Sequence, residues 1–488
     1  MRILMVASEA APFAKTGGLA DVLGALPRAL SQLGHSVDVV LPRYRGITAG
    51  KPIGRLLVPQ GELGAAAAVF SHCDGGVQTL FVEHPAYFDR ESLYGEGGQD
   101  YHDNAARFGF LSRAAVEWAA IYPEPYDVIH VHDWQAGLVP VFLRQGGAPV
   151  YRRVPVICTI HNLAYQGVFD PDWLPQLGLR SSLMSPDALE FWGRISLLKG
   201  GIVFSDLVTT VSPRYAMEIQ TPEYGCGFEG LLQSRSRDLV GILNGIDYDQ
   251  WDPARDPYLP QPFDASRLDG KTAAKRALLE RAGWSADEAG LRRPLIGLVS
   301  RMVDQKGFNL LTELGDTLLT LGARFVVLGT GERRYEDFWR ALAAKSPGCV
   351  FANIGFDEEM AHAIEGGADL FLMPSRFEPC GLNQMYSQRY GTVPVVRSVG
   401  GLSDTVQNFN RATGAGTGFA FDEYAASALL DTLRRALRTY EDRDAWRRVQ
   451  RAGMQQDFSW DRSAREYVGL YERAGSGGAQ GRAAHPST

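Results

Sequence analysis

The sequence lacks a long hydrophobic run and uses cysteine sparingly. None of its apolar segments approaches the roughly 18 residues that a membrane-spanning helix needs, which argues against such a helix. The five cysteines are an odd number and have neither the spacing of metal ligands nor that of a disulfide framework. No basic leader with a cleavage pattern precedes the first apolar segment, so we expect a cytoplasmic protein.

The chain also has fewer basic than acidic residues. The 49 lysines and arginines are outnumbered by 56 acidic residues, which gives a formal net charge of -7. Proteins that bind nucleic acids through their phosphates need an excess of basic surface, so we expect no nucleic-acid partner and no membrane partner. A local basic pocket for a small anion is still compatible with this composition.

The chain does contain many short β-branched runs that alternate with amphipathic stretches of helix length. Several of these runs are apolar throughout, as in parallel strands that helices cover on both faces. A chain of 488 residues is also too long for a single core. The pattern therefore predicts two doubly wound α/β units. The expected strands are residues 2–8, 36–42, 78–83, 127–133, 154–162 and 206–212 in the first unit, and 294–301, 323–331, 349–356, 369–375 and 393–398 in the second.

A segment rich in proline and aspartate separates the two series of strands, and we place the domain connection there. Near the end, Tyr467, Leu470 and Tyr471 have helical spacing, with Ser459 or Asp461 as a candidate cap. Only small and polar residues follow, which predicts a disordered tail. The expected organisation is an N-terminal domain over 1–243, a connection over 244–264, a C-terminal domain over 265–457, a helix over 458–474 and a tail over 475–488.

The stretch KTGGLADV, residues 15–22, lies where the first strand gives way to the first helix. In open α/β sheets this turn is a favoured position for an anion. Gly17 and Gly18 would let the backbone approach a phosphate, and Lys15 would add positive charge. The stretch matches neither a Walker loop nor a dinucleotide-binding motif. By itself, a tight turn with a solvated lysine explains it equally well, and Asp21 could be an acid that the helix dipole favours.

Two basic residues follow a strand of the second half, in the motif SRMVDQKG. Arg301 offers a planar fork that suits a phosphate, and Lys306 offers a mobile point charge. The alternative is that the two residues belong to a solvated face. Their position at the end of a strand favours an anion site.

A second motif of that half, SRFEPCGLNQ, also follows a strand. Glu378 could accept hydrogen bonds from hydroxyl groups, while the amides of Cys380, Gly381 and Leu382 could face an anion. The alternative for Glu378 is an acid that interacts only with a helix dipole. In the first half, TIHNLAYQG places His161 just past a strand, although a packed or capping histidine is the commoner case.

Six motifs together closely resemble bacterial glycogen synthase and its plant relative, starch synthase: KTGGLADV, HVHDWQAGLVP, TIHNLAYQG, LNGID, SRMVDQKG and SRFEPCGLNQ. The resemblance covers residues 1–474, and the motifs occur in the order and at the separations found in the family. It implies an α/β fold of the GT-B class, with two Rossmann-like doubly wound domains and the active site in the interdomain cleft. It also implies that the C-terminal helix crosses back to the N-terminal domain.

The same resemblance implies a reaction. Glucose passes from ADP-glucose to the nonreducing 4-hydroxyl of an α-1,4-glucan, such as glycogen or a maltooligosaccharide, with retention at the anomeric carbon and release of ADP. Arg301 and Lys306 would neutralise the diphosphate, Glu378 would contact the glucose hydroxyls, and His161 would approach the glucosyl group. Carried over by motif, the catalytic residues are Glu378, His161, Arg301, Lys306 and Asp21, and the donor-binding residues are Lys15, Gly17, Gly18, Asn244, Phe356, Cys380, Gly381 and Leu382.

Two positions differ from the common pattern of the family. Phe356 stands where tyrosine is frequent, and its ring could still stack on adenine. Asn383 stands where threonine is usual, and because its amide has a different reach we leave it out of the site. No Asp-x-Asp is placed to hold a divalent ion, so we expect neither a metal nor a cofactor. Glu378 as a nucleophile and attack by the acceptor on the face of departure both stay open.

Two other functions compete with this interpretation. Another retaining GT-B glucosyltransferase that uses UDP-glucose would share the glutamate and the Arg/Lys pair. A noncatalytic glucan-binding protein would lack Lys15, Arg301, Lys306 or Glu378, all of which are present. Glycogen phosphorylase has a much longer chain and needs pyridoxal phosphate on a lysine.

Overall fold

The computed structural model describes residues 1–61, 63–146, 151 and 153–477. The chain divides into two compact units. Unit 1 consists of Met1–Val211, Ala216–Gly245 and the described residues from Trp460 onward, and unit 2 consists of Ser212–Tyr215 and Ile246–Ser459. Unit 2 is therefore an insertion in unit 1 along the chain. The domain limits drawn from the sequence stay predictions.

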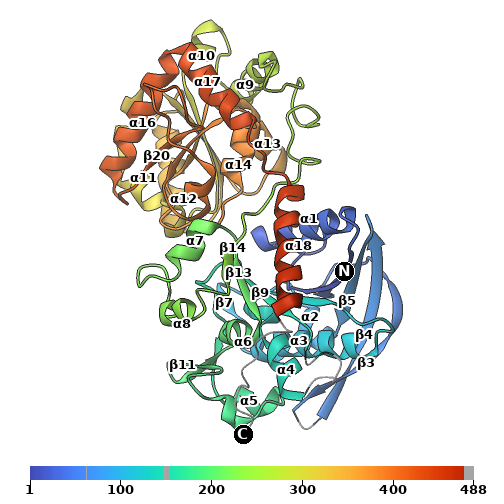
Figure 1. The fold of residues 1–488 in the computed structure, drawn as a ribbon. Helices are drawn as coiled ribbons and strands as arrows, with labels where there is room; N and C mark the ends of the chain where they lie inside the picture. Colours follow the sequence, from blue (N-terminus) through green and yellow to red (C-terminus); the bar gives the residue numbers. More distant parts are fainter. Residues whose placement is uncertain (62, 147–150, 152, 478–488) are drawn as a thin grey trace. The chain divides into compact units, whose positions relative to one another are not determined.

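Unit 1 is built on a nine-stranded sheet in which every strand predicted from the sequence is present (Figure 1). The strand order is β14-β13-β9-β8-β1-β2-β5-β4-β3, and all neighbours from β14 to β5 are parallel. Strands such as β9, with the sequence VICTI, are fully buried, as expected for strands covered on both faces. The strands are β1 (Arg2–Val6), β2 (Ser36–Pro42), β3 (Lys51–Gln60), β4 (Leu63–Asp74), β5 (Val77–Glu83), β8 (Val128–His132), β9 (Val156–Ile160), β13 (Leu207–Thr210) and β14 (Leu239–Gly241).

The hairpin β3–β4 extends this sheet in an antiparallel sense and is absent from the predicted strands. Its sequence gives a weak signal, because β3 contains Pro52 and Pro59 and β4 contains a run of four alanines. Proline and alanine are both depleted in strands. Pairing along the edge of β5 therefore overrides the local preference of these residues.

Two small sheets complete the strands of unit 1, and neither was predicted. One is three-stranded in the order β10-β12-β11, and the other is a two-stranded pair. They are short, so they lack the periodicity that identifies a strand. The strands are β6 (Gly95–Glu96), β7 (Gln99–Asp100), β10 (Val168–Phe169), β11 (Glu190–Phe191) and β12 (Arg194–Ser196).

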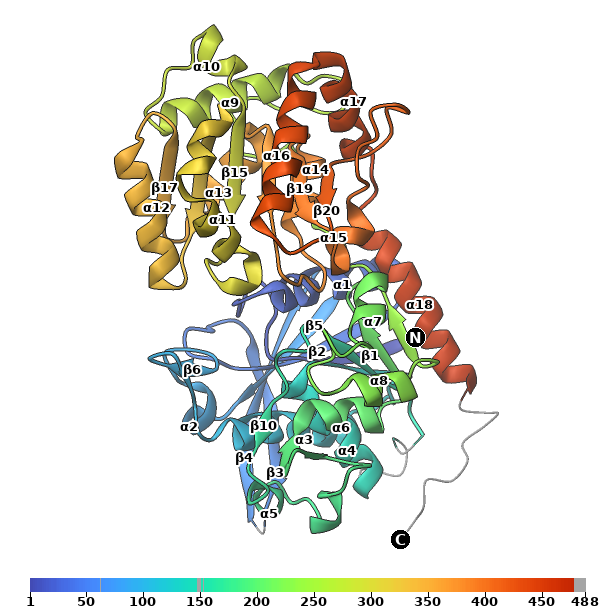
Figure 2. The same ribbon diagram turned by 90° about the vertical axis from the view of Figure 1, so that its left-hand side faces the viewer.

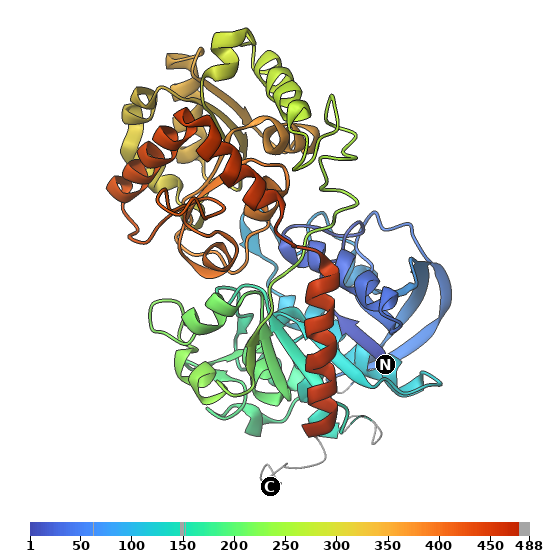
Figure 3. The same cartoon turned by 45° about the horizontal axis from the view of Figure 1, so that its top comes forward.

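The last helix, α18, packs on unit 1 beside α1, as Figures 1 and 3 show. It begins at Trp460, directly after Ser459, and buries Tyr467 and Tyr471 in the core shared with β1 and β2. The helix continues to Gly477, so residues 475–477, which we predicted to be disordered, are helical; residues 478–488 of that tail lie outside the described residues. The helices assigned to 1–245 are α1 (Gly18–Gln32), α2 (Pro85–Phe88), α3 (Asn104–Ile121), α4 (Leu138–Gly146), α5 (Trp173–Gln176), α6 (Leu197–Phe204), α7 (Pro213–Glu218) and α8 (Glu229–Ser234).

Unit 2 has a six-stranded, fully parallel sheet in the order β17-β16-β15-β18-β19-β20 (Figure 2). Numbered from its own first strand, this order is 3-2-1-4-5-6, which is the Rossmann arrangement. All five strands predicted for this unit are present, and β20 is an addition. The strands are β15 (Leu295–Val299), β16 (Arg324–Gly329), β17 (Val350–Ile354), β18 (Leu370–Met373), β19 (Val393–Arg397) and β20 (Phe419–Phe421).

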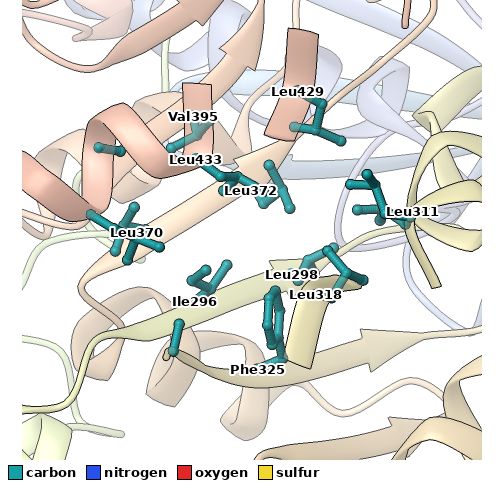
Figure 4. Packing of buried hydrophobic residues seen from close by; sticks show 14 of the residues in the cluster. Ile296, Leu298, Leu311, Leu318, Phe325, Leu370, Leu372, Val395, Leu429 and Leu433 are labelled. Carbon is teal, nitrogen blue, oxygen red and sulfur yellow. The ribbon is translucent and has the colours of Figure 1, made fainter. Parts of the chain in front are cut away.

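Helices cover both faces of this sheet. Figure 4 shows one face, where Ile296, Leu370 and Phe325 from the strands pack against Leu311 of α11 and Leu433 of α16. The other face packs against α9 and α13. The helices are α9 (Asp269–Arg281), α10 (Glu288–Arg292), α11 (Phe308–Leu314), α12 (Arg333–Lys345), α13 (Glu358–Gly367), α14 (Asn383–Arg389), α15 (Gly400–Thr405), α16 (Ala426–Glu441) and α17 (Arg443–Met454).

Within the described residues, none of the helices combines the length and the apolar character that crossing a membrane requires.

Candidate active site

The predicted site residues follow the central strands of each sheet. In unit 1 the strand order reverses at β1, whose neighbours are β2 and β8, and Lys15 follows β1. In unit 2 the order reverses between β15 and β18; Arg301 and Lys306 follow β15, and Glu378 follows β18. Ligands of open α/β sheets bind at such reversals, outside the carboxyl ends of the strands. The topology therefore supports a binding position in each unit.

The turn that carries KTGGLADV is organised by Glu9, a buried carboxylate that the sequence analysis did not identify. Its side chain accepts hydrogen bonds from the Thr16 amide at 2.5 Å, the Thr16 hydroxyl at 2.6 Å and the Gly17 amide at 3.3 Å. The Tyr94 hydroxyl also donates to it. These two amides are thus engaged by the protein, and the Ala20 amide of the first turn of α1 donates to the Gly17 carbonyl at 3.2 Å.

Lys15 forms an ion pair with Asp21 at 2.5 Å, and its side chain is 55% exposed. A Cβ atom added at Gly17 or Gly18 would meet no atom within 4 Å, and Gly17 has an extended φ of -160° that any residue adopts. The fold itself therefore does not require glycine at these two positions. Open space in front of the turn is what close approach of a ligand needs.

His161 lies next to His132, with 3.0 Å between His161 Nε2 and His132 Nδ1. Burial lowers the pKa of His161 to about 3 and holds the pKa of His132 well below its usual range. Both rings are therefore neutral at pH 7. Because His132 occupies Nε2 of His161, this nitrogen is not available as a general base.

Asp133 holds the His161 segment in place, and the sequence analysis assigned it no role. Its carboxylate accepts a hydrogen bond from the His161 amide at 2.7 Å and another from the Asn162 amide. Its backbone has a φ of +56°, which is strained for a residue with a side chain. Burial raises the pKa of Asp133 to about 7. The motif HVHDW, in which a polar residue follows a buried strand, could have indicated that Asp133 belongs to the site.

His130, two residues before His132 in β8, links this strand to α18. His130 is hydrogen-bonded to the Tyr471 hydroxyl at 2.9 Å and to the Thr159 hydroxyl at 2.6 Å. Burial lowers the pKa of His130 to about 3. The last helix therefore supports the strand that positions Asp133.

Asn244, in the motif LNGID, is buried after β14 in unit 1. Its side-chain oxygen has no hydrogen-bond partner within the described residues. Such buried, unpaired polar atoms are rare, and a ligand hydroxyl would satisfy this one.

In unit 2, Lys306 and Glu378 form a bidentate ion pair. The Lys306 ammonium donates to Oε1 of Glu378 at 2.8 Å and to Oε2 at 2.6 Å, and the Ser375 hydroxyl donates to Oε2 at 3.0 Å. The Glu378 side chain is only 6% exposed. The two residues are 72 positions apart, and the parallel pairing of β15 with β18 brings them together.

Two glycines fix the backbone around Glu378. Gly400 has a φ of +44°, and a Cβ there would lie 1.9 Å from the Glu378 carbonyl oxygen. A Cβ at Gly401 would lie 2.1 Å from the Cys380 carbonyl oxygen, and the Gly401 amide donates to the Glu378 carbonyl at 3.1 Å. This glycine pair follows the predicted strand 393–398 but is not among the predicted site residues.

Arg301 is exposed, and its guanidinium forms no ion pair with any residue that the structure describes. Close to it, the Asn383 side-chain amide donates to the Val299 carbonyl at 2.8 Å. Asn383 therefore ties the first turn of α14 to the end of the strand that carries Arg301. The Asn383 side-chain amide therefore has a structural contact, a role that the sequence did not predict.

The remaining predicted residues lie at the edges of the unit 2 site. Phe356 follows β17 and is 90% exposed, so its ring is available for stacking. Cys380 is buried, and Gly381 has a φ of +72°, which favours glycine. No hydrogen bond from the Gly381 or Leu382 amide is present within the described residues. Among all the residues that the structure describes, no group of three or more His, Cys, Asp or Glu side chains could hold a metal ion.

Comparison with known proteins gives matches over nearly the whole chain. Residues 2–234 match the starch synthase catalytic domain, and residues 286–452 match the glycosyl transferases group 1 model. A glycogen synthase of Koribacter versatilis is 47% identical over 480 residues, covering 97% of this chain and 98% of that protein. The chain belongs to the glycogen synthase family. A glycogen synthase of Anaeromyxobacter dehalogenans is 50% identical over 478 residues, covering 96% of this chain and 99% of the relative.

A solved structure supports the same family. The catalytic domain of starch synthase IV from Arabidopsis thaliana, bound to ADP and acarbose, has a TM-score of 0.88 and 36% identity and covers 97% of this chain and 99% of that one. Membership of the glycogen synthase family confirms the predicted GT-B fold and makes the protein a glucosyltransferase. The roles of the individual site residues stay predictions.

Proposed function

We propose that the protein is a glycogen synthase that transfers glucose from ADP-glucose to the nonreducing 4-hydroxyl of an α-1,4-glucan, with retention and release of ADP. The observation that carries this proposal is the buried Lys306–Glu378 pair at the strand reversal of unit 2, with Arg301 following the same strand as Lys306. Family membership and the ADP in the starch synthase IV structure support the choice of nucleotide.

The basic residues of unit 2 stabilise the leaving diphosphate. Breaking the bond between glucose and the diphosphate builds negative charge on the phosphate oxygens. Arg301 has no competing carboxylate among the described residues, so its full charge acts on the ligand. Lys306 is already held by Glu378 and needs no reorganisation when the charge develops. Preorganised charge of this kind is the usual source of electrostatic catalysis.

Glu378 positions the glucose ring and balances the developing oxocarbenium charge. Three donor contacts, from Lys306 and Ser375, already engage its two oxygens, which weakens it as a nucleophile. A carboxylate has further lone pairs, and these accept sugar hydroxyls. The proposal therefore favours attack by the acceptor on the face from which ADP departs.

Unit 1 contributes hydroxyl recognition to the same reaction. The unpaired Asn244 oxygen accepts a sugar hydroxyl, and the neutral His161 positions the glucosyl group without acting as a base. Lys15 lies beside the nucleotide sugar, where Gly17 and Gly18 leave space, and Asp21 lies near the glucosyl group or the acceptor. In unit 2, the exposed Phe356 ring stacks on adenine, and the amides of Cys380, Gly381 and Leu382 face the phosphate or the sugar.

The decisive experiment measures release of ADP or UDP from ADP-glucose and UDP-glucose, with glycogen, maltooligosaccharide or glucose as the acceptor. We expect the highest kcat/KM with ADP-glucose and a glucan, and full activity in excess chelator, because Arg301 and Lys306 balance the diphosphate. A higher kcat/KM with UDP-glucose would favour the alternative, a UDP-glucose-dependent GT-B enzyme. Loss of activity in chelator, restored by Mg²⁺, would overturn the assignment of the two cations.

A further inference from the structure

Three residues other than glycine have a positive φ in the part of the chain that the structure describes: Asp133 at 56°, Trp192 at 54° and Cys226 at 49°. All three connect to the segment 161–169. Asp133 accepts a hydrogen bond from the first amide of that segment, and the Cys226 carbonyl accepts one from the Gln166 side chain at 2.9 Å. Trp192 lies at the tip of the β11–β12 hairpin, and β12 pairs with β10 at the end of the segment. Strained backbone persists most often at functional sites.

Trp192 is the least expected of the three. Phe191 pairs with Arg194, so Trp192 and Gly193 form a two-residue turn in which both have positive φ, 54° and 77°. Such a turn strongly prefers asparagine followed by glycine, because a bulky side chain disfavours this conformation. The Gly193 amide donates to the Glu190 side chain at 2.8 Å, which stabilises the turn. The fold therefore supports a tryptophan where a small residue would be easier.

The indole of Trp192 is nevertheless 82% exposed. Its Nε1 atom lies beside Gly227, where an added Cβ would come within 3.3 Å of it. The neighbouring Phe191 ring packs on Phe228 at 4.4 Å between ring centroids, which anchors the base of the hairpin. A large aromatic ring is thus presented to solvent at the tip of a hairpin whose base is packed.

We propose that Trp192 is a platform on which a glucose ring of the acceptor glucan stacks, at a distance along the chain from the ring that receives the new glucose. The inference rests on the proposed function. The apolar face of a glucose ring complements the flat indole, and the indole N–H can donate to a sugar hydroxyl. The Ser196 hydroxyl donates to the Gln166 carbonyl at 2.8 Å, and the Leu197 amide donates to the Gly167 carbonyl at 3.0 Å. These bonds join the Trp192 hairpin to the segment that carries His161, so we take the ligand of Trp192 to be the same acceptor glucan.

The test uses the whole enzyme and a series of acceptors from maltotriose to maltoheptaose, together with glycogen. Trp192→Asn removes the ring and suits the positive φ, so this variant folds, while Trp192→Phe keeps an aromatic surface. Ile121→Ser removes another exposed apolar side chain of unit 1 and serves as the matched control. For Trp192→Asn we expect the acceptor KM to rise about tenfold for the longest acceptors, with little effect on maltotriose and on kcat. An equal KM ratio at every acceptor length would overturn the proposal.

A binding measurement separates this inference from the proposed function. Binding of maltoheptaose without donor is followed by calorimetry in the wild type and in Trp192→Asn. We expect Kd to rise about tenfold in the variant and to stay near the wild-type value in Trp192→Phe and Ile121→Ser. An unchanged Kd in Trp192→Asn would overturn the platform. If the wild type transferred glucose to none of the acceptors but bound maltoheptaose through Trp192, the proposed function would fail and the platform would stand.

Discussion

The two lysine–carboxylate pairs of the candidate site differ in almost every physical respect. Lys15 and Asp21 form a half-exposed pair on a turn, and Glu9 adds a second carboxylate beside the same turn. Lys306 and Glu378 form a nearly buried bidentate pair, and Arg301 adds a second cation after the same strand. Among these six residues, cationic charge therefore predominates in unit 2 and acidic charge in unit 1. The difference supports the proposal that unit 2 binds the diphosphate, whereas unit 1 mainly recognises uncharged groups.

The largest effect should come from Lys306→Ala. Removing this ammonium takes away a preorganised charge and leaves the buried Glu378 unpaired. We expect kcat to fall by roughly two to three orders of magnitude, without rescue by saturating donor. Lys345→Ala is the matched control, because Lys345 pairs with Asp316 at the surface of the same unit. A folded Lys306→Ala enzyme with near wild-type kcat would remove the diphosphate role from Lys306.

A second contrast uses one glycine from each unit. In Gly400→Ala the new Cβ would collide with the Glu378 carbonyl, so we expect a loss of about 1–3 kcal/mol in the free energy of unfolding. In Gly17→Ala the new Cβ meets no protein atom, so stability should be unchanged while the donor KM rises. Chemical denaturation and donor kinetics measure the two effects. Equal destabilisation by both substitutions would contradict the contrast.

The histidines should make unit 1 sensitive to acid. The pKa of His130 and of His161 is lowered to about 3, so between pH 6.5 and 3 the unfolded chain binds protons that the folded chain excludes. Stability should therefore fall as the pH drops through 6.5, by up to about 2 kcal/mol for His130 alone between pH 6.5 and 5. The pKa of Asp133 is raised to about 7 and burial also raises the pKa of Asp38, so these two carboxyl groups act in the opposite sense and offset part of the fall.

Thermal unfolding at pH 7 and pH 5 measures this dependence. The drop in Tm should be smaller in His132→Phe, which removes one of the low-pKa histidines and preserves a ring of similar size. A wild-type Tm that falls no more than the Tm of His132→Phe would contradict this role of the neutral histidines.

Lys15→Ala should have a more modest effect than Lys306→Ala. The pair with Asp21 is half-exposed and screened by solvent, so stability should change by less than about 0.5 kcal/mol. We expect kcat/KM for the donor to fall about five- to tenfold, since one exposed cation contributes weakly. Steady-state kinetics with the donor varied provides the measurement. A loss as large as that of Lys306→Ala would remove the distinction between the two units.

The smallest effect should come from Asn383→Thr, which restores the residue that is usual in the family. The substitution removes the hydrogen bond from the Asn383 amide to the Val299 carbonyl, a neutral contact that contributes about 0.5–1.5 kcal/mol. We expect a small decrease in Tm and a change of less than about threefold in kcat/KM. A large kinetic effect at unchanged Tm would give Asn383 a direct role toward the substrate.

The sequence predicted the parts of this molecule that depend on local pattern. All eleven expected strands are present, because a run of apolar β-branched residues is a strong signal for a buried parallel strand. The hairpin β3–β4 was missed because Ala65–Ala68 and two prolines disfavour a strand locally. The supports of the site, Glu9, Asp133 and Gly400, were missed for another reason. Each acts through a contact with the backbone of a different motif, and no local pattern records that partner.

The position of α18 has a consequence for synthesis of the chain. The core of unit 1 includes Trp460, Tyr467 and Tyr471, which the ribosome makes only after the whole of unit 2. All the strands of unit 2 are synthesised before α18, so unit 2 can fold first. During that time the apolar surface of unit 1 beside α1 stays uncovered. Until the last helix emerges, nascent unit 1 is therefore exposed to aggregation and is a natural client for a chaperone.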